Sequence, residues 1–277
     1  MKSVLVTGAA RGIGKAISLR LAETGWQVYA GVRKPADGDA LVAQHPGIIP
    51  VLLDITDADQ IAALDQTLPA DLDAVVNNAG IVVDGPVEIL STESLRDQFE
   101  VNVIGTIAVT QAVLPRIRAN KGRIVFLSSL SGRISTPGTG AYNSSKFALE
   151  GMVDALRIEL RPWGIPVSMI EPGPIATDMW SDAVQMVDNT IARLTPAQSE
   201  LYANHLAGMR KMAQQVQKIA APVSTVVDEV ERALTTRRPK ARYVVGLSGK
   251  IQALSAGLTP TPILDAVLAM ASGIKRR

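Results

Sequence analysis

The segment Ser3-Val4-Leu5-Val6-Thr7-Gly8-Ala9-Ala10-Arg11-Gly12-Ile13-Gly14 decides the fold of this chain. It opens with a short, apolar, β-branched run, which is typical of a buried parallel strand. The glycine-rich turn leads into a helical stretch at 15–24. A strand, a glycine-rich turn and a helix in this order aim backbone N–H groups at a diphosphate. The spacing T-G-x3-G-x-G differs from the commoner G-x-G-x-x-G, so the turn alone is a weak indication of a nucleotide site.

Composition excludes several classes of protein. The chain has 277 residues, 47% hydrophobic and 19% charged, which fits one large α/β domain over 1–277. A net charge of +2 gives no electrostatic reason to expect a nucleic-acid partner. The chain lacks cysteine, which excludes disulfides and thiolate catalysis, and we predict no metal site. The N-terminus is too briefly apolar for a signal peptide, and no apolar run is long enough to span a membrane, so we expect a cytoplasmic location.

Apolar runs alternate with helical stretches along the chain. The runs lie at 3–7, 27–32, 48–53, 72–76, 122–128, 167–171 and 242–245. This alternation predicts a doubly wound, mainly parallel sheet of seven strands with helices on both faces. Ligands of such sheets bind beyond the carboxyl ends of the strands. Gly8, Asn78, Ser129 and Pro172 each follow a strand end, so we expect one site along that edge.

The end of the second strand favours one cofactor over another. Many dinucleotide sites carry an acidic residue there, which binds the adenosine ribose hydroxyls. This chain instead has Gly31 followed by Val32, Arg33 and Lys34. Two cations without a carboxylate suit a 2′-phosphate, and Arg11 could reach the same group. The pattern favours NADP(H) over NAD(H); the alternative is three solvated surface cations.

Three further polar positions need an explanation. Asp54, before Ile55, either caps the next helix or accepts a hydrogen bond from an adenine amino group. Asn77-Asn78-Ala79-Gly80 is either a plain turn or a place where backbone approaches a ligand. Asn102 lies in an apolar stretch, where it must find hydrogen-bond partners or cost a few kcal/mol.

The segment 141–146, A-Y-N-S-S-K, supplies acid–base chemistry. Tyr142 and Lys146 are four residues apart, so a helix places both side chains on one face. An ammonium near a phenol favours the phenolate, so we expect Lys146 to lower the pKa of Tyr142 from roughly 10 towards neutrality. Such a tyrosine can give a proton to a carbonyl oxygen or take one from an alcohol. Ser129, thirteen residues upstream, could hold the same oxygen.

Two segments lie outside this pattern. Residues 178–221 are helical and rich in Met and Gln, which suits either a flexible lid over an apolar substrate or a helix pair with its own core. The tail, 247–277, covers the substrate cleft, touches a membrane surface, or docks as a terminal helix. We assign no role to His45 or His205. The apolar residues of the expected lid include Met179, Trp180, Met186, Leu194, Leu201, Leu206, Met209 and Met212.

Together these features resemble the short-chain dehydrogenase/reductase family. The matching motifs occur in the family's order over residues 1 to about 180: Thr7-Gly8-x3-Gly12-Ile13-Gly14, Asn77-Asn78-Ala79-Gly80, Asn102, Ser129, Tyr142-x3-Lys146 and Pro172-Gly173-x3-Thr177. The segment 28–33 also resembles the NADP-preferring 17β-hydroxysteroid dehydrogenases. The segment 241–246, followed by Lys250, is similar to the retinol and hydroxysteroid dehydrogenase branch.

The resemblance implies a Rossmann fold and a role for each site residue. Tyr142 would be the general acid/base, Lys146 would lower its pKa and bind the nicotinamide ribose, Ser129 would hold the substrate oxygen, and Asn102 would order a water in a proton relay. Besides Tyr142 and Lys146, the residues implied to bind the cofactor are Gly8, Arg11, Ile13 and Gly14 at the pyrophosphate and ribose end, Arg33 at the 2′-phosphate, and Asp54, Ile55, Asn78, Ala79, Gly80, Pro172, Gly173, Ile175 and Thr177 along the remainder.

We therefore expect an NADP(H)-dependent oxidoreductase that interconverts an alcohol and a carbonyl on an apolar, steroid-like or retinoid-like substrate. Reduction is the expected direction. The resemblance also implies a homodimer or homotetramer, formed through two long helices. Two alternatives stay open: the same chemistry on a small polar or acyl-carrier substrate, and a regulator that binds NADP without turnover.

Overall fold

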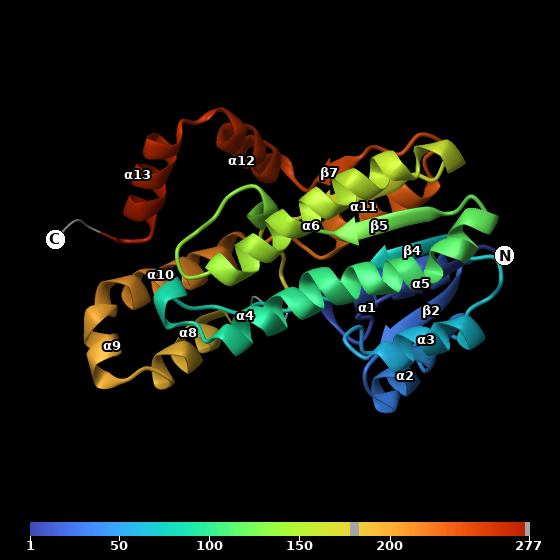
Figure 1. Cartoon of the computed structure of the whole chain (residues 1–277), viewed down its shortest axis with the longest axis horizontal. Helices are drawn as coiled ribbons and strands as arrows, with labels where there is room; N and C mark the ends of the chain where they lie inside the picture. The colour runs from blue at the N-terminus through green and yellow to red at the C-terminus, as the bar shows by residue number, and fades with distance from the viewer. Residues whose placement is uncertain (178–182, 275–277) are drawn as a thin grey trace.

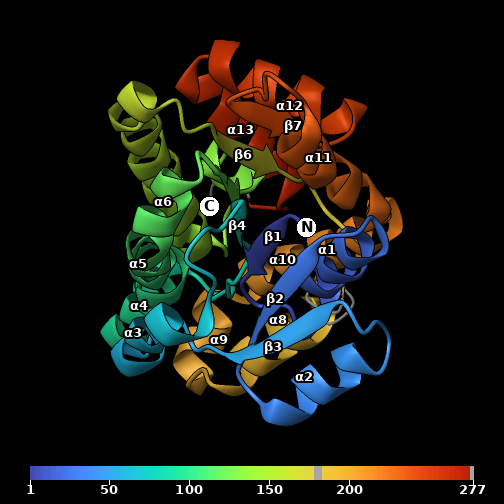
Figure 2. The ribbon, with the colours of Figure 1, turned by 90° about the vertical axis from the view of Figure 1, so that its right-hand side faces the viewer.

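A computed structural model describes residues 1–177 and 183–274 of the chain. Its centre is a seven-stranded parallel sheet in the order β3-β2-β1-β4-β5-β6-β7 (Figures 1 and 2). Every expected strand is present, with ends that differ from the expectation by at most two residues. The strands are β1 Ser3–Val6, β2 Gln27–Val32, β3 Ile48–Leu52, β4 Ala74–Asn77, β5 Arg123–Leu127, β6 Val167–Glu171 and β7 Arg242–Val244.

The strand order reverses at β1, which positions the ligand edge. Leu5 of β1 pairs with Tyr29 of β2 on one side and with Val75 of β4 on the other. The chain therefore leaves β1 for one half of the sheet and returns at β4 to build the other half. Such a reversal opens a crevice beyond the carboxyl ends of the two central strands.

Helices cover both faces of the sheet, as expected. On one face lie α1 Gly12–Glu23, α2 Pro35–Val42 and α11 Ser224–Thr235. These helices pack on the sheet through one apolar core, to which they contribute Ile17, Leu41 and Val230. On the other face, α3 Ala58–Thr67, α5 Thr106–Ala119 and α6 Gly140–Glu159 contribute to a second core with Leu64, Val113 and Leu149.

The long helical region before α5 contains a local widening. Ser91 caps α4 Thr92–Phe99 by accepting a hydrogen bond from the Ser94 amide at 3.0 Å. The segment η2 Glu100–Gly105 is a π-helix, and α5 continues from it. Gly105 lies so close to the Ile55 carbonyl that a side chain there would collide with it. Short 3-10 turns occur at η1 Val87–Ile89, η3 Leu130–Gly132 and η4 Arg161–Trp163.

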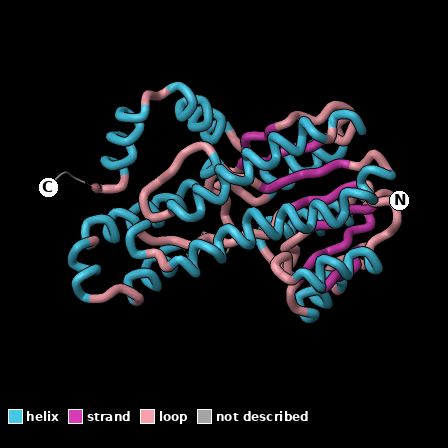
Figure 3. The backbone as a smooth tube through the Cα atoms, viewed as in Figure 1, coloured by secondary structure: helices cyan, strands magenta, loops and turns pink. Residues whose placement is uncertain are grey.

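Beyond the strand ends lies a group of helices that we call the cap: α8 Ala183–Ala192, α9 Pro196–Leu201, α10 Ala203–Ile219, α12 Leu247–Leu258 and α13 Thr261–Ala271. Figure 3 shows the strands at one end of the molecule and the cap helices at the other. Val187 of α8 and Ala213 of α10 are buried against each other's helices, so the helix pair does have its own small core. Met179 and Trp180 of the expected lid lie outside the described residues.

The tail docks onto this helix pair. Gly208 of α10 lies against the carbonyl of Ser272, and a side chain at position 208 would collide with that carbonyl. The tail thus joins the cap as two helices, rather than the one docked helix that was considered. Within the described ranges, the structure contains no helix with both the length and the apolar character needed to cross a bilayer.

Candidate active site

The glycine turn after β1 is shaped for an anion. Gly8 has a φ of +64°, and a Cβ there would lie 2.9 Å from the Cα of Ala79. A Cβ on Gly14 would collide with the Gly8 carbonyl. Arg11 is the N-cap of α1, yet no side chain of the described residues caps this helix, and its first turn carries no acidic residue. The first amides of α1 are thus available to a negatively charged group such as a diphosphate.

Asn78 fastens this turn to β4. The amides of Asn78 and Ala79 both donate to the Thr7 hydroxyl at 3.0 Å. The Asn78 side-chain nitrogen donates to the carbonyls of Thr7 and Gly8 at 2.9 and 3.1 Å. Asn78 therefore has a structural role that the sequence did not indicate, and only its side-chain oxygen is left for the expected ligand contact.

The expected cations gather around the end of β2. The Ala9 amide donates to the Gly31 carbonyl at 2.9 Å, so the glycine turn lies beside this strand end. Arg11, Arg33 and Lys34 are exposed, and in the ranges 1–177 and 183–274 no carboxylate forms a salt bridge with them. Unpaired cations beside an open helix N-terminus suit a phosphorylated ligand.

One alternative for Asp54 is wrong. Its carboxylate accepts hydrogen bonds from the amide and the hydroxyl of Thr56 at 3.0 and 2.8 Å. The cap of α3 is instead Asp57, which accepts from the amides of Asp59 and Gln60 at 2.9 and 3.1 Å. An adenine contact of Asp54 stays a prediction. The Ile55 side chain is buried in the core, so a ligand could meet only the backbone of this residue.

The segment after β6 connects the two halves of the expected site. The Pro172 carbonyl accepts from the Leu130 amide at 2.9 Å and from the Ser129 hydroxyl at 3.4 Å. At the other end of this segment, a Cβ on Gly12 would lie 3.7 Å from Thr177. Residues 172–177, including Gly173 and the buried Ile175, therefore run from the serine to the glycine turn. The candidate cofactor residues thus follow one edge of the sheet.

Tyr142 and Lys146 occupy the first turns of α6, where both side chains are buried, with exposed fractions of 8% and 6%. The Lys146 Nζ donates to the Leu127 carbonyl at 2.8 Å, at the end of β5. It lies 5.8 Å from the centre of the Tyr142 ring. The helix therefore brings the ammonium, the phenol and the strand end that precedes Ser129 into one place.

The expected effect of Lys146 on Tyr142 is wrong for this structure. Burial raises the pKa of Tyr142 above its ordinary value, and the interaction with the Ser129 hydroxyl opposes this only in part. Burial also lowers the pKa of Lys146 to about 8, against the opposing charge of Glu150. Desolvation is the largest effect on the pKa of each group. Tyr142 is therefore a protonated phenol at neutral pH, which makes it a proton donor.

Asn102 is buried in the π-helix and fully occupied, as a polar residue in an apolar stretch must be. Its oxygen accepts from the Ile81 amide at 2.9 Å, and its nitrogen donates to the Ile81 carbonyl at 3.0 Å. The same nitrogen donates to the Ser145 hydroxyl at 3.1 Å, and Ser145 donates to the Tyr142 carbonyl at 2.7 Å. Asn102 thus links the loop after β4 to the turn that carries the tyrosine.

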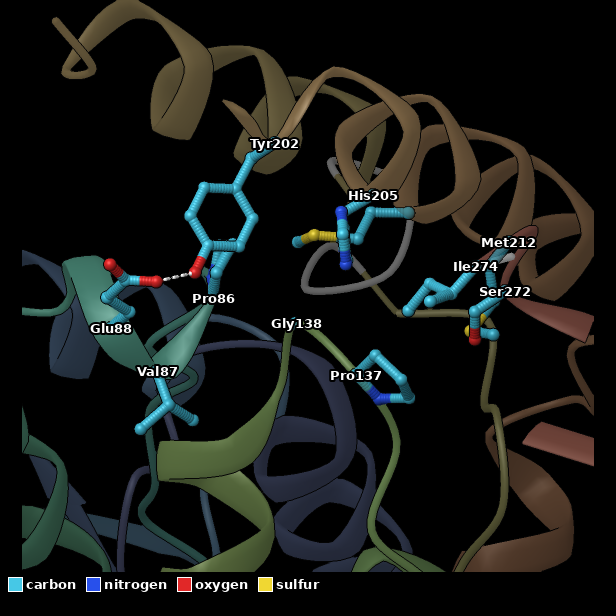
Figure 4. Close-up of a pocket in the computed structure, with 11 residues that line it drawn as sticks. Pro86, Val87, Glu88, Pro137, Gly138, Tyr202, His205, Met212, Ser272 and Ile274 are labelled. Atoms are coloured by element: carbon cyan, nitrogen blue, oxygen red, sulfur yellow. Dashed lines mark hydrogen bonds between the residues drawn. The ribbon is translucent and has the colours of Figure 1, made fainter. Parts of the chain in front are cut away.

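A cavity of about 340 Å³ lies between the cap and the start of α6 (Figure 4). Pro137 and Gly138, shortly before Tyr142, form part of its wall, and α10 contributes Met209 and Met212. The two methionines were expected to face a substrate. The other lining residues were not anticipated from the sequence: Pro86, Val87, Glu88, Tyr202, His205, Ser272 and Ile274.

Contacts between distant segments build this cavity, and they explain why the sequence did not reveal it. The Tyr202 hydroxyl contacts the Glu88 carboxylate, which closes the wall between α10 and η1 (Figure 4). Ser272 and Ile274 belong to the tail, which therefore forms part of the wall of this cavity. Neither sequence spacing nor periodicity predicts such pairings. Among the described residues, no cluster of His, Asp and Glu could hold a metal ion.

Comparisons with known proteins agree with this geometry. Residues 2–188 match the family model of short chain dehydrogenases. The chain is 33% identical over 280 residues to the NADPH-dependent 3-dehydrocapnine reductase of Ornithobacterium rhinotracheale, covering 96% of each protein. It is 34% identical to mouse retinol dehydrogenase 5, covering 96% of this chain and 87% of that protein. A short chain dehydrogenase from Burkholderia cenocepacia, solved in complex with NADP, superposes with a TM-score of 0.75 at 28% identity, covering 97% of this chain and 99% of the other.

Proposed function

The chain belongs to the short-chain dehydrogenase/reductase family of oxidoreductases, and from this premise we propose that it reduces the carbonyl group of an apolar compound to an alcohol, with NADPH as its cofactor. The observation that carries the proposal is the burial of Tyr142 beside Ser129 and Lys146 at the edge of the sheet. A phenol that keeps its proton at neutral pH favours the reductive direction, because reduction needs a proton donor at the carbonyl oxygen.

The glycine turn and the cations at the end of β2 fit the cofactor. The amides at the start of α1 would bind its pyrophosphate, and Arg33 with Arg11 would bind its 2′-phosphate. The NADPH-dependent relative and the NADP-bound Burkholderia dehydrogenase support this assignment. When bound, the cofactor supplies the hydride, and the protein supplies orientation and the proton.

The side chains around the substrate oxygen have separate tasks. Tyr142 gives its proton to that oxygen, while the Ser129 hydroxyl donates a hydrogen bond to it. The Lys146 ammonium stabilises the tyrosinate that remains and holds the nicotinamide ribose. Asn102, through Ser145, keeps the first turn of α6 in place. Because its side chain is occupied, the water of the proton relay would meet the main chain of Asn102 instead.

The cavity supports an apolar substrate. Proline, valine, methionine and isoleucine side chains form much of its wall, and a volume of about 340 Å³ suits a lipophilic aldehyde or ketone. The similarity to mouse retinol dehydrogenase 5 points the same way.

We further propose a homodimer or homotetramer through α5 and α6, because Phe147, Met152 and Ile158 leave apolar surface exposed on α6. The lack of cysteine is in keeping with a cytoplasmic location.

A substrate panel tests this function. We expect NADPH consumption with retinoid, steroid and long-chain aliphatic carbonyl compounds, with kcat/KM at least about tenfold above that for small polar ketones and acyl-carrier thioesters. NADH should support a much slower reaction. Preference for the small polar compounds would contradict the substrate assignment. Tight NADPH binding without turnover on any compound would favour a regulator instead.

A further inference from the structure

A partly buried network of charges lies behind the proposed catalytic residues. Arg242 of β7 contacts three carboxylates: Glu150 at 3.0 Å, Asp154 at 2.7 Å and Glu171 at 3.1 Å. Glu171 is fully buried and also accepts two hydrogen bonds from Arg133, at 2.6 and 2.8 Å. None of these groups touches the reacting atoms in the proposed mechanism. Buried ion pairs are seldom needed for stability alone, so their place in the fold requires a reason.

Each end of the network touches an element that carries a proposed catalytic side chain. Glu150 lies one turn beyond Lys146 on α6. Arg133 directly follows η3, the turn that Ser129 begins. Gly132 of that turn packs directly on Glu150, because a Cβ at position 132 would lie 2.9 Å from the Glu150 Cγ. Glu150 therefore supports the serine turn with its side chain and faces the lysine along the helix.

The charge of Glu150 is only partly neutralised by Arg242. The guanidinium contacts the oxygen Oε2, while Oε1 is buried and makes no contact with the guanidinium. Burial raises the pKa of Glu150 and the charge of Glu171 adds to that rise, while the Ser128 hydroxyl and Arg242 oppose it. The remaining negative charge raises the pKa of Lys146 against the effect of burial.

We propose that Glu150, held in place by Arg242, is a positioning residue that keeps the buried Lys146 ammonium charged and supports the Ser129 turn. This inference rests on the proposed function. The other groups around the pair come from several elements: Tyr142 of α6 and the Leu127 carbonyl of β5 lie near Lys146, while Asp154 of α6, Glu171 of β6 and Arg133 after η3 surround Arg242 and Glu150. The Ser128 hydroxyl also lies against Glu150, and among the described residues Glu150 is the carboxylate whose charge raises the pKa of Lys146.

The sign of the effect follows from this arrangement. Removing the carboxylate lowers the pKa of Lys146 below about 8. Lys146 then loses its proton at a lower pH, and the activity that depends on its ammonium falls off earlier as pH rises. A purely structural role of Glu150 would lower activity equally at every pH.

Glu150→Gln and Asp154→Asn form a matched pair for the first test. Each removes one carboxylate from Arg242 while keeping the shape of the side chain. For Glu150→Gln we expect the alkaline side of the pH profile of kcat/KM to shift to lower pH by about 0.5–1 unit. The pH profile of NADPH affinity, measured by fluorescence, should shift in the same way. For Asp154→Asn both profiles should stay where they are. Equal shifts in both variants, or no shift in Glu150→Gln, would overturn the proposal.

A double-mutant cycle with Lys146→Met provides a readout that needs neither cofactor nor activity. At pH 7, Glu150→Gln should lower the Tm by about 2 °C more in the wild-type background than in the Lys146→Met background. At pH 10, above the pKa of Lys146, this difference should vanish. An equal loss in both backgrounds at pH 7 would overturn the proposal even if the substrate assignment holds. If Glu150→Gln lowers the Tm more in the wild-type background at pH 7 but the enzyme turns over no carbonyl compound, the proposed function is wrong while the role of Glu150 stands.

Glu150→Asp serves as the second variant, including the case in which Glu150→Gln does not fold. It keeps the charge on a shorter side chain, so its alkaline limb should stay within about 0.3 pH unit of the wild type. A downward shift as large as that expected for the neutral glutamine would contradict the electrostatic role.

Discussion

The edge of the sheet and the cap are built differently. At the edge, two buried side chains make directed hydrogen bonds: Lys146 binds the Leu127 carbonyl, and Asn102 bridges Ile81 and Ser145. In the cap, the Nδ1 of His205 and the hydroxyl of Ser272 are buried with no hydrogen-bond partner among the described residues. The cap also leaves large apolar side chains in solvent, with Leu258 at 75% and Met270 at 77% exposure.

This difference suggests a division of tasks. The hydrogen bonds of Lys146 and Asn102 and the close glycine contacts hold α6 and the glycine turn in a defined arrangement, which a proton transfer requires. Apolar contacts and flexible methionines allow the cap to adapt to the shape of a substrate. Substitutions at the edge should therefore change turnover, and substitutions in the cap should change which substrate is accepted.

The largest effect separates Tyr142 of the sheet edge from Tyr202 of the cap. Tyr142→Phe removes the proton donor, so kcat should fall about a thousandfold while the Tm changes little. Tyr202→Phe removes only the contact with Glu88, so kcat should stay within about threefold and KM should rise. Steady-state NADPH oxidation measures both. Comparable losses of kcat in the two variants would remove the distinction between the edge and the cap.

A smaller effect concerns the cofactor end of the edge. Arg33→Asp replaces a cation with a charge that repels a 2′-phosphate and suits ribose hydroxyls. The NADPH/NADH ratio of kcat/KM should fall by about a hundredfold. Lys2→Asp is a control that changes the same charge at a residue beside Trp26, away from this strand end. An unchanged ratio in Arg33→Asp would contradict the phosphate assignment.

The docking of the tail on the cap should affect selectivity. An alanine at Gly208 collides with the Ser272 carbonyl, so Gly208→Ala should displace the tail from the cavity wall. We expect KM for a long apolar aldehyde to rise about tenfold, with little change for a small ketone. Gly257→Ala is the matched control, because no atom lies within 4 Å of its new methyl group. A uniform loss on both substrates would mean that the tail acts on the edge as well.

The smallest effect is on stability. Burial lowers the pKa of Lys146 to about 8 in the folded chain, whereas an unfolded chain keeps the ordinary, higher value. Between these two values the unfolded state binds more protons, so folding stability rises with pH. Between pH 8 and 10, the Tm of the wild type should therefore rise by roughly a few degrees more than the Tm of the Lys146→Met variant. Parallel curves for the two proteins would show that Lys146 is not desolvated.

Local patterns allowed the sheet and its edge to be predicted. Apolar runs gave all seven strands, and Ser91 marked the start of α4, because these features depend on neighbouring residues. The helix α2 was not predicted, since its short polar sequence is stabilised by contacts such as that of Gly38 with Pro50. The cap cavity and the network around Arg242 also escaped prediction. Both join residues that are tens of positions apart in the sequence and have no common periodicity.

Sequence spacing also misjudged the phenol. A lysine four residues from a tyrosine predicts a lowered pKa only if the pair stays solvated, and the fold buries both side chains. Burial favours the neutral form of each group, which reverses the expected direction for Tyr142. The extent of this burial depends on the packing of α6 against η3 and the sheet, which no short motif reveals.

The proton state of Tyr142 is the most direct test of this account. An ultraviolet difference titration between the wild type and Tyr142→Phe isolates the absorbance of this one phenol from the other tyrosines. Our account predicts that the phenolate of Tyr142 forms only at higher pH than that of an ordinary tyrosine, because burial raises its pKa. A phenolate that appears between pH 6 and 8 would contradict the assignment of Tyr142 as the proton donor for reduction.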